Sequence, residues 1–323
     1  MDARWERLWT DTLKPWLDEL ELERKKALRY RLQATGMGFV AGLGFGALLL
    51  LWAGDWVFFG FGVFVATVMG VTIGNKRVSD LSKRVKVQLN TAIAEALELS
   101  YLEKPSQPAR LQTLRDFDLL PSYNRCKFED HFSGSRQGCD FELYEAHLEQ
   151  RRRSNKRTYF VTVFRGVIIR INFPRKVEGV TVISRDSGWF NGMAAIGRSM
   201  GGHDLKRIGL VDPKFERIFE VYGDDQVLAR YMLTPSFMER LITLEEALHG
   251  KRVRAMFDEH SGEGELLIAA ETGNLFEIGS MGKPLADQSR VQSIVGELSQ
   301  ILEIIDLLVE PAKFGDASAV ALD

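Results

Sequence analysis

Two long apolar runs near the start of the chain dominate its hydrophobic pattern. The first extends from Thr35 to Ala53 and the second from Trp56 to Ile73, with only Gly54 and Asp55 between them. A helix that spans a bilayer needs roughly 20 apolar residues. At mid-bilayer the backbone must satisfy its own hydrogen bonds, which favours helices. The pattern therefore predicts a transmembrane helical hairpin over residues 34–74.

Helical periodicity continues on both sides of this hairpin. Residues 2–32 carry tryptophans and leucines at helical spacing, and Pro15 is a potential break or kink. Residues 75–101 carry an apolar stripe at the same spacing. We expect the two segments to pair as antiparallel cytoplasmic helices, or the first to lie on the membrane surface.

Beyond a linker at residues 104–108 and a short helix at 109–120, the pattern changes to alternation of polar and apolar residues. The clearest hairpin joins residues 157–164 to 167–173 at Arg165-Gly166. Short turns between consecutive strands indicate an antiparallel sheet. The other predicted strands are 124–132, 140–151, 177–184, 215–222, 253–257, 265–270 and 275–278.

Two further helices complete the predicted elements. Thr234 caps a helix that begins with Pro235 and ends near His249, and Asp287 caps a strongly amphipathic terminal helix that stops at Pro311. The fold class is therefore α+β, with a transmembrane helical hairpin, flanking amphipathic helices, and a cytoplasmic domain of antiparallel sheet plus helices. The predicted domains are 1–33, 34–74, 75–103, 104–310 with a potential division near 185–205, and a disordered tail at 311–323.

The distribution of charge predicts the orientation of the hairpin. Lys and Arg cluster at residues 24–31 and again at 76–86, whereas the turn at Gly54-Asp55 has none. Positive residues favour the cytoplasmic side, so both termini are predicted to be cytoplasmic. These clusters suit anionic lipid headgroups. The net charge of the chain is −2, which gives no indication of a nucleic-acid partner.

Glycines recur four residues apart in both apolar runs. Small residues let helices pack closely in lipid. They either pack the two helices of one hairpin or assemble a homo-oligomer. Neither run contains Lys, Arg, Glu or His, which argues against a transport path. The glycines in question are Gly38, Gly42, Gly46, Gly70 and Gly74.

No catalytic set is identified by spacing. Cys126 and Cys139 fit neither a redox pair nor a zinc site, and we expect them to be reduced. Residues 192–199, GMAAIGRS, resemble a P-loop but have Arg198 in place of Lys and no buried strand before them. The five histidines do not form a metal set. We therefore expect no catalytic residue, cofactor or metal site. The alternative is a membrane-tethered enzyme that acts on a lipid or small molecule.

Two stretches are candidate contact sites. The first is an acidic turn followed by a cation, which is either a ligand or partner site or a structural turn. The second is an irregular apolar stretch within 185–205, either a membrane-contacting loop or a loop folded over its own domain. The residues of the first are Tyr222, Gly223, Asp224, Asp225 and Arg230, and those of the second are Trp189, Phe190, Met193 and Ile196.

The hairpin is followed by FDLLPSYNR, VFRG, DPKFERIFEVYGDDQVLARYMLTP and LFEIGS. With these segments the chain resembles, over most of residues 20–310, a bacterial family of unknown function. Its members look like two-span membrane proteins, are sometimes labelled "galanin-like", and are often encoded beside LemA-type membrane proteins. The resemblance implies a bacterial inner membrane and a LemA-type partner, and it carries over no catalytic residue. The expected function is a membrane-anchored cytoplasmic binding or scaffold module.

Overall fold

The computed structural model describes residues 6–154, 157–173, 177, 179–185, 198–247 and 251–309. These residues form two compact units. The first contains the described residues up to Ala96 together with Glu277–Ile294, and the second contains Leu97–Phe276 and the chain from Val295 onward. The first unit is helical and the second combines a sheet with helices, so the predicted α+β class is confirmed.

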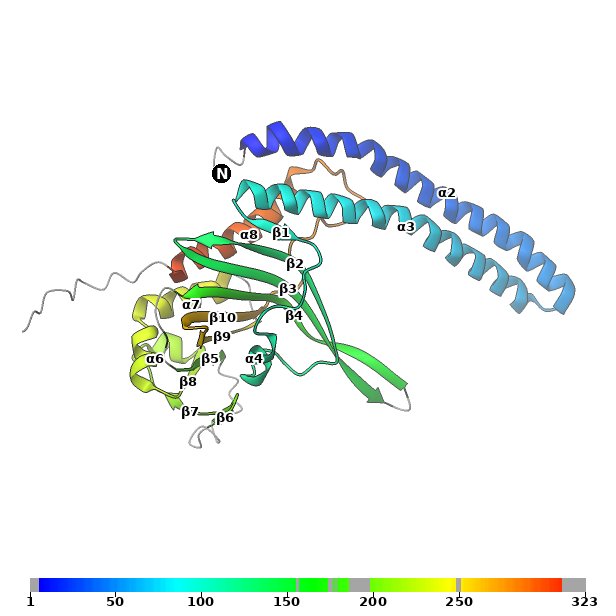
Figure 1. The fold of residues 1–323 in the computed structure, drawn as a ribbon. Helices are drawn as coiled ribbons and strands as arrows, with labels where there is room; N and C mark the ends of the chain where they lie inside the picture. Colours follow the sequence, from blue (N-terminus) through cyan, green and yellow to red (C-terminus); the bar gives the residue numbers. More distant parts are fainter. Residues whose placement is uncertain are drawn as a thin grey trace, which may run out of the picture. The chain divides into compact units, whose positions relative to one another are not determined.

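Two long helices make up most of the first unit (Figure 1). A π-helical turn, η1 (Leu8–Leu13), leads into α2 (Lys14–Ala53), and α3 covers Trp56–Ala96. Gly54 ends α2 at a φ of 72°, the left-handed conformation that favours glycine. Pro15 follows closely on the π-helical turn η1, and the chain is helical on both sides of it, so the predicted break does not occur. Both helices are long and apolar enough to cross a membrane.

The polar ends of α2 and α3 also pack against each other. Arg84 of α3 forms a 2.8 Å ion pair with Glu23 of α2, and the Arg77 guanidinium lies 3.7 Å from the centroid of the Tyr30 ring. From residue 6 onward, the structure therefore shows the first helical segment paired with the segment that follows the hairpin, as in the first of the two predicted alternatives. The buried apolar residues between these ends are Leu13, Leu17, Val78, Leu81, Val85, Leu89 and Ile93.

A segment from far along the chain packs on this helical pair. Residues 277–287, here called the strap, connect the sheet to the terminal helix and belong to the first unit. Arg24 donates to the carbonyl of Met281 at 2.8 Å, and the Leu285 N–H donates to Glu21 at 3.0 Å. Lys86 pairs with Glu277 at 2.6 Å. The sequence pattern gave no sign of this return to the helices.

The second unit is built on a ten-stranded sheet in which all pairings are antiparallel. The strand order is β1-β2-β3-β4-β10-β9-β5-β8-β7-β6, so strands on both sides of residues 185–205 join the same sheet. Its strands are β1 (Ser100–Leu102), β2 (Arg125–Arg136), β3 (Cys139–Ser154), β4 (Arg157–Phe173), β5 (Thr181–Arg185), β6 (Arg198–Met200), β7 (His203–Ile208), β8 (Phe219–Gly223), β9 (Lys251–His260) and β10 (Glu263–Glu271).

One predicted hairpin is wrong. Residues 157–173 form the single strand β4, and the turn lies between Ser154 and Arg157. Gly166 is not a turn residue. It lies within the strand, and the position requires glycine because a Cβ there would collide with the carbonyl oxygen of Ala270 on β10. Glycine in a strand often marks such a close backbone approach. The sequence alone does not distinguish this role from a turn.

Two other predicted strands are also corrected. Residues 275–278 are not a strand, because Phe276 has a φ of 56°, outside the extended region. The predicted strand at 215–222 is divided into α5 (Pro213–Glu216) and β8. Asp212 begins this helix by accepting hydrogen bonds from the N–H groups of Lys214 and Phe215. The Asp-Pro pair at residues 212 and 213 was thus the start signal of a short helix.

Both faces of the sheet are covered. One face of the sheet, here called the α4 face, is covered by α4 (Leu111–Asp116). The leucines of this helix pack into a core with Tyr144, Ile168 and Leu267. On the opposite face, α7 (Pro235–Ala247) places the Phe237 ring 5.2 Å from that of Phe257. The remaining helices are α6 (Gln226–Met232) and α8 (Gln288–Val309).

The predicted helix caps are confirmed. The Thr234 hydroxyl accepts from the N–H of Phe237 at 3.2 Å at the start of α7. The Asp287 carboxylate accepts from the N–H of Ser289 at 3.1 Å at the start of α8. Each polar side chain satisfies an N–H that has no partner within its helix.

Candidate functional site

The predicted acidic turn lies at the end of β8. The Tyr222 side chain is buried, and its hydroxyl donates to Glu220 at 3.0 Å. Gly223 packs closely on β7, because a Cβ there would lie 2.8 Å from the Cδ1 atom of Ile208, which would have to move. Asp224 joins this turn to the residues before β5, since its carboxylate accepts from the Val180 N–H at 3.0 Å. These three residues therefore have structural partners within the sheet.

The other two residues of this stretch point to different partners. Asp225 is the N-cap of α6 and accepts from the N–H groups of Val227 and Leu228 at 2.7 and 3.1 Å. Arg230 donates to the carbonyl of Gly209 at 3.4 Å. The structure thus brings Asp224 within 3.4 Å of His203, but it gives Asp225 and Arg230 separate contacts. The arrangement matches the structural-turn alternative, and a ligand site here stays a prediction.

The predicted membrane-contacting loop residues Trp189, Phe190, Met193 and Ile196 lie outside the described residues. So do residues 192–197 of the P-loop-like stretch. Both interpretations stay predictions.

The five predicted packing glycines of the apolar runs face the partner helix of their own hairpin. A Cβ on Gly38 would lie 2.6 Å from the Ala66 carbonyl oxygen, and one on Gly46 would lie 2.7 Å from that of Phe59. Similar close approaches occur at the three other predicted positions, Gly42, Gly70 and Gly74. The geometry is that of packing within one hairpin. Homo-oligomer formation stays a prediction.

A charged cluster that the sequence analysis missed lies on the α4 face. In the register of β3, β4, β10 and β9, Glu142 lies opposite Arg170, and Glu265 lies opposite Asp258. Side chains two residues apart on a strand share a face, so all four point toward α4. Arg110, directly before α4, completes the cluster: its guanidinium pairs with Asp258 and lies 3.4 Å from Glu265.

The Glu265 carboxylate is the centre of this cluster. Its side chain is only 2% exposed, and Arg170 donates to it through two nitrogens at 2.8 and 2.5 Å. Arg170 also lies 3.5 Å from Glu142. Because each guanidinium is matched by carboxylates, the cluster fastens the start of α4 to four strands. Its chemistry is that of a structural clamp.

Two titratable groups beside this cluster have shifted pKa values. Burial, together with the negative charge of Glu142, raises the pKa of Tyr144 to about 12. The His131 ring stacks on Tyr144 with centroids 4.2 Å apart, and burial lowers its pKa. Both shifts favour the neutral forms. His131 and Tyr144 therefore form a packed, uncharged aromatic pair beside the charged cluster.

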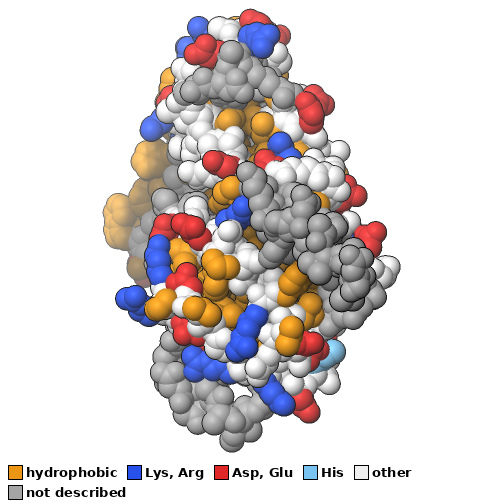
Figure 2. Space-filling model, turned by 90° about the vertical axis from the view of Figure 1, so that its left-hand side faces the viewer, with side chains coloured by type: hydrophobic (Ala, Val, Ile, Leu, Met, Phe, Trp, Pro, Cys, Tyr) orange, Lys and Arg blue, Asp and Glu red, His pale blue; other side chains and the backbone are white. Residues whose placement is uncertain are grey.

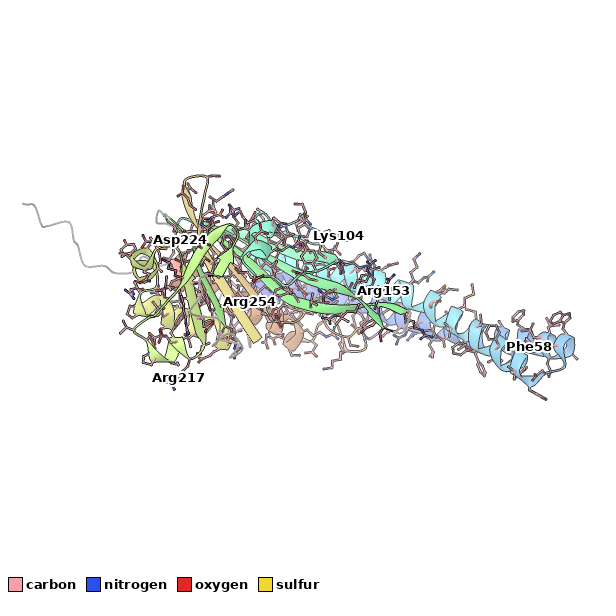
Figure 3. The ribbon with its side chains drawn as sticks, turned by 90° about the horizontal axis from the view of Figure 1, so that it is seen from below. Phe58, Lys104, Arg153, Arg217, Asp224 and Arg254 are labelled. Atoms are coloured by element: carbon pink, nitrogen blue, oxygen red, sulfur yellow. The ribbon has the colours of Figure 1, made fainter. Side chains whose placement is uncertain are left out.

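A second missed feature is the basic arm, formed by residues 150–154 of β3 and 157–161 of β4. Figure 1 shows these strand ends extending past their neighbours, and Figure 3 labels Arg153 on the extension and Arg254 within the sheet. The arm lies beyond the first residue of β2, Arg125, which pairs with Glu149 of β3. On the face shown in Figure 2, by contrast, basic and acidic side chains are interspersed among apolar ones.

The part of the chain that the structure describes contains neither a cluster of metal ligands nor a pair of bonded cysteines. No group of three or more His, Cys, Asp or Glu residues could hold a metal ion there. Cys126 and Cys139 are both free. Burial raises the pKa of the Cys139 thiol, which lowers its reactivity.

Comparisons with known proteins add a family match over part of the chain. Residues 162–309 match a family described as "Protein of unknown function (DUF3137)". No curated protein matches the chain. The crystal structure of the mycobacterial trehalose monomycolate transport factor A, TtfA, overlays with a TM-score of 0.32 and 10% identity, covering 68% of this chain and 96% of that one. This similarity is too low to indicate a shared fold.

Proposed function

We propose that this protein is a binding or scaffold module anchored in the bacterial inner membrane, with both termini in the cytoplasm. The observation that carries the proposal is the surface of the apolar hairpin. Leu51, Trp52 and Trp56 at its turn are 84%, 85% and 72% exposed. Large apolar side chains that stay exposed after the helices have paired suit contact with lipid tails, because burial in water-free surroundings is favourable.

The hairpin interior supports an anchor rather than a transporter. Backbone approaches at the glycines fill the space between the helices. The apolar runs contain no Lys, Arg, Glu or His that could carry an ion or proton. We therefore assign the work of the protein to its sheet domain, which follows the anchor in the chain from Leu97 onward.

The distribution of positive charge supports the orientation. Lys and Arg occur before and after the hairpin but not at its turn. The test is labelling of intact cells with a membrane-impermeant maleimide. We expect an Asp55→Cys variant to be labelled from outside, and the exposed native Cys126 only after the inner membrane is permeabilised. Labelling of Cys126 in intact cells would reverse the orientation.

The partner is tested by crosslinking in cells, purification of the full chain in mild detergent, and identification of bound proteins by mass spectrometry. We expect one protein at a constant ratio to this chain. The resemblance to the galanin-like family makes a LemA-type membrane protein the first candidate. A matched control is another two-span protein expressed at the same level. A chain that is purified without a specific protein or lipid contradicts the binding-module proposal.

A further inference from the structure

The basic arm carries charge of a single sign. Residues 150–164 contain five basic residues and no acidic residue, although the whole chain has a net charge of −2. Arg151, Arg152, Arg153 and Arg157 are all exposed. Like charges that lie close together repel one another, and an anionic partner lowers that repulsion. The arm is therefore suited to an anionic surface.

The two strands of the arm lack further strand support. In the described register, residues 150–154 and 157–161 pair only with each other. An isolated two-stranded ribbon is marginally stable in water. Near the base, Arg125 stacks on Phe160 with 3.4 Å between the guanidinium and the ring centroid, and Asn124 accepts from the Arg151 N–H at 2.8 Å. Beyond that base, the side chains of Arg152, Arg153 and Arg157 are exposed.

One face of the arm combines cations with exposed apolar groups. Arg152 lies opposite Tyr159, and Gln150 lies opposite Val161. Residues two apart on a strand share a face, so Arg157 joins them. Tyr159 is 47% exposed and Val161 is 38% exposed. Arginine beside tyrosine is the composition of the bilayer interface, where the ring meets the apolar boundary and the cation meets the phosphate.

We propose that the basic arm docks on anionic lipid headgroups at the surface of the bilayer in which the protein is anchored. This inference rests on the proposed function, because a chain anchored in the bilayer ties the arm covalently to that bilayer and raises the effective concentration of its headgroups. Acidic proteins and RNA also attract arginines, but no other feature of the residues that the structure describes points to either. Each basic residue near an anionic surface strengthens association about fivefold, so a small ribbon suffices.

The test places a spin label on the arm of the full chain in lipid nanodiscs. The labelled residue is Tyr159→Cys in a Cys126→Ser background, and the control label is Val211→Cys, which is 93% exposed and outside the arm. Accessibility to a water-soluble paramagnetic reagent is compared between pure phosphatidylcholine and its mixture with phosphatidylglycerol. We expect the anionic lipid to protect position 159 but not position 211, and added salt to remove the protection.

Charge reversal identifies the arginines as the cause. Arg152→Glu with Arg157→Glu should lower the association constant of the arm for the anionic surface by on the order of 25-fold or more. The protection of position 159 should fall accordingly. Lys214→Glu with Arg217→Glu makes the same charge change at exposed positions outside the arm and should leave it intact. Figure 3 labels Arg217 on this control surface.

Three results overturn the inference. Position 159 could be equally accessible in both lipids, protected in both regardless of salt, or protected only after RNA or an acidic protein is added. Extraction of the chain from cell membranes by alkaline carbonate separates this failure from that of the anchor. A chain that resists extraction while position 159 stays accessible refutes the docking of the arm alone.

Discussion

Arg170 and Glu265 lie 95 positions apart in the chain, yet Arg170 donates two hydrogen bonds to one carboxylate oxygen of Glu265. Antiparallel pairing of β4 with β10 brings them together. Breaking a buried ion pair by removing one partner is costly, because the other charge stays buried. The pair is thus a sensitive point of the sheet domain.

Arg170→Met should lower the free energy of unfolding of this domain by about 3 kcal/mol. Hydrogen–deuterium exchange of β4 and β10 in the full chain measures the change. Glu142→Gln is the matched control, because it removes the more exposed carboxylate at 3.5 Å and should cost only about 0–1 kcal/mol. Equal effects of the two variants would refute the central role of Glu265.

Asp225→Ala removes the cap of α6 and should lower stability by about 1 kcal/mol. If Asp225 has only this structural role, partner capture is unchanged at temperatures where the variant is folded. Asp225→Asn is the control, because Asn also caps helices and keeps most of the stability. Loss of the captured partner in the Asn variant would instead favour a binding site at residues 222–230.

Gly70→Ala should destabilise the hairpin, because the added Cβ collides with the Ala34 carbonyl oxygen. Gly44→Ala is the control, since no atom lies within 4 Å of a Cβ at that position. Loss of helical circular dichroism on heating in mild detergent compares them. We expect a lower midpoint for the Gly70 variant and an unchanged or higher one for the Gly44 variant. Equal midpoints would contradict the close helix contact.

We predict that the strap is sensitive to acid, because the Leu285 N–H of the strap donates to the Glu21 carboxylate. Its hydrogen bond with Arg24 is the main cause that lowers the pKa of Glu21 from 4.5 to about 2. A folded-state pKa below the unfolded value contributes stability above pH 4.5 that is lost as the pH falls toward 2.

Amide exchange of residues 277–287, corrected for the intrinsic effect of pH, should therefore increase between pH 4.5 and 2 relative to neutral pH. Glu21→Gln should show faster exchange already at neutral pH and little further change. Asp18→Asn, one turn earlier on α2, is the control and should behave like the unchanged chain. A wild-type strap that shows no acid response would contradict the role of Glu21.

The sequence revealed those candidate sites that depend on neighbouring residues, but not those that depend on contacts between distant segments. The acidic turn at Asp224 and Asp225 was visible in the sequence because turn residues and caps act on their immediate neighbours. Glu265 and Arg170 were visible only as polar residues within apolar strands, and their partners could not be identified. The basic arm was visible as a run of arginines, but the misplaced turn at Gly166 concealed that they lie on one projecting ribbon.

The sequence by itself determined the elements whose stability is local. Apolar length predicted the two long helices, and caps such as Thr234 and Asp287 marked where helices begin, because both effects act within a few residues. Only the tertiary structure decided that β10 inserts between β4 and β9, that residues 277–287 return to α2 and α3, and that Gly166 continues a strand. These features depend on contacts between distant segments. Several pairings satisfy the same local alternation, and the packed sheet selects one of them.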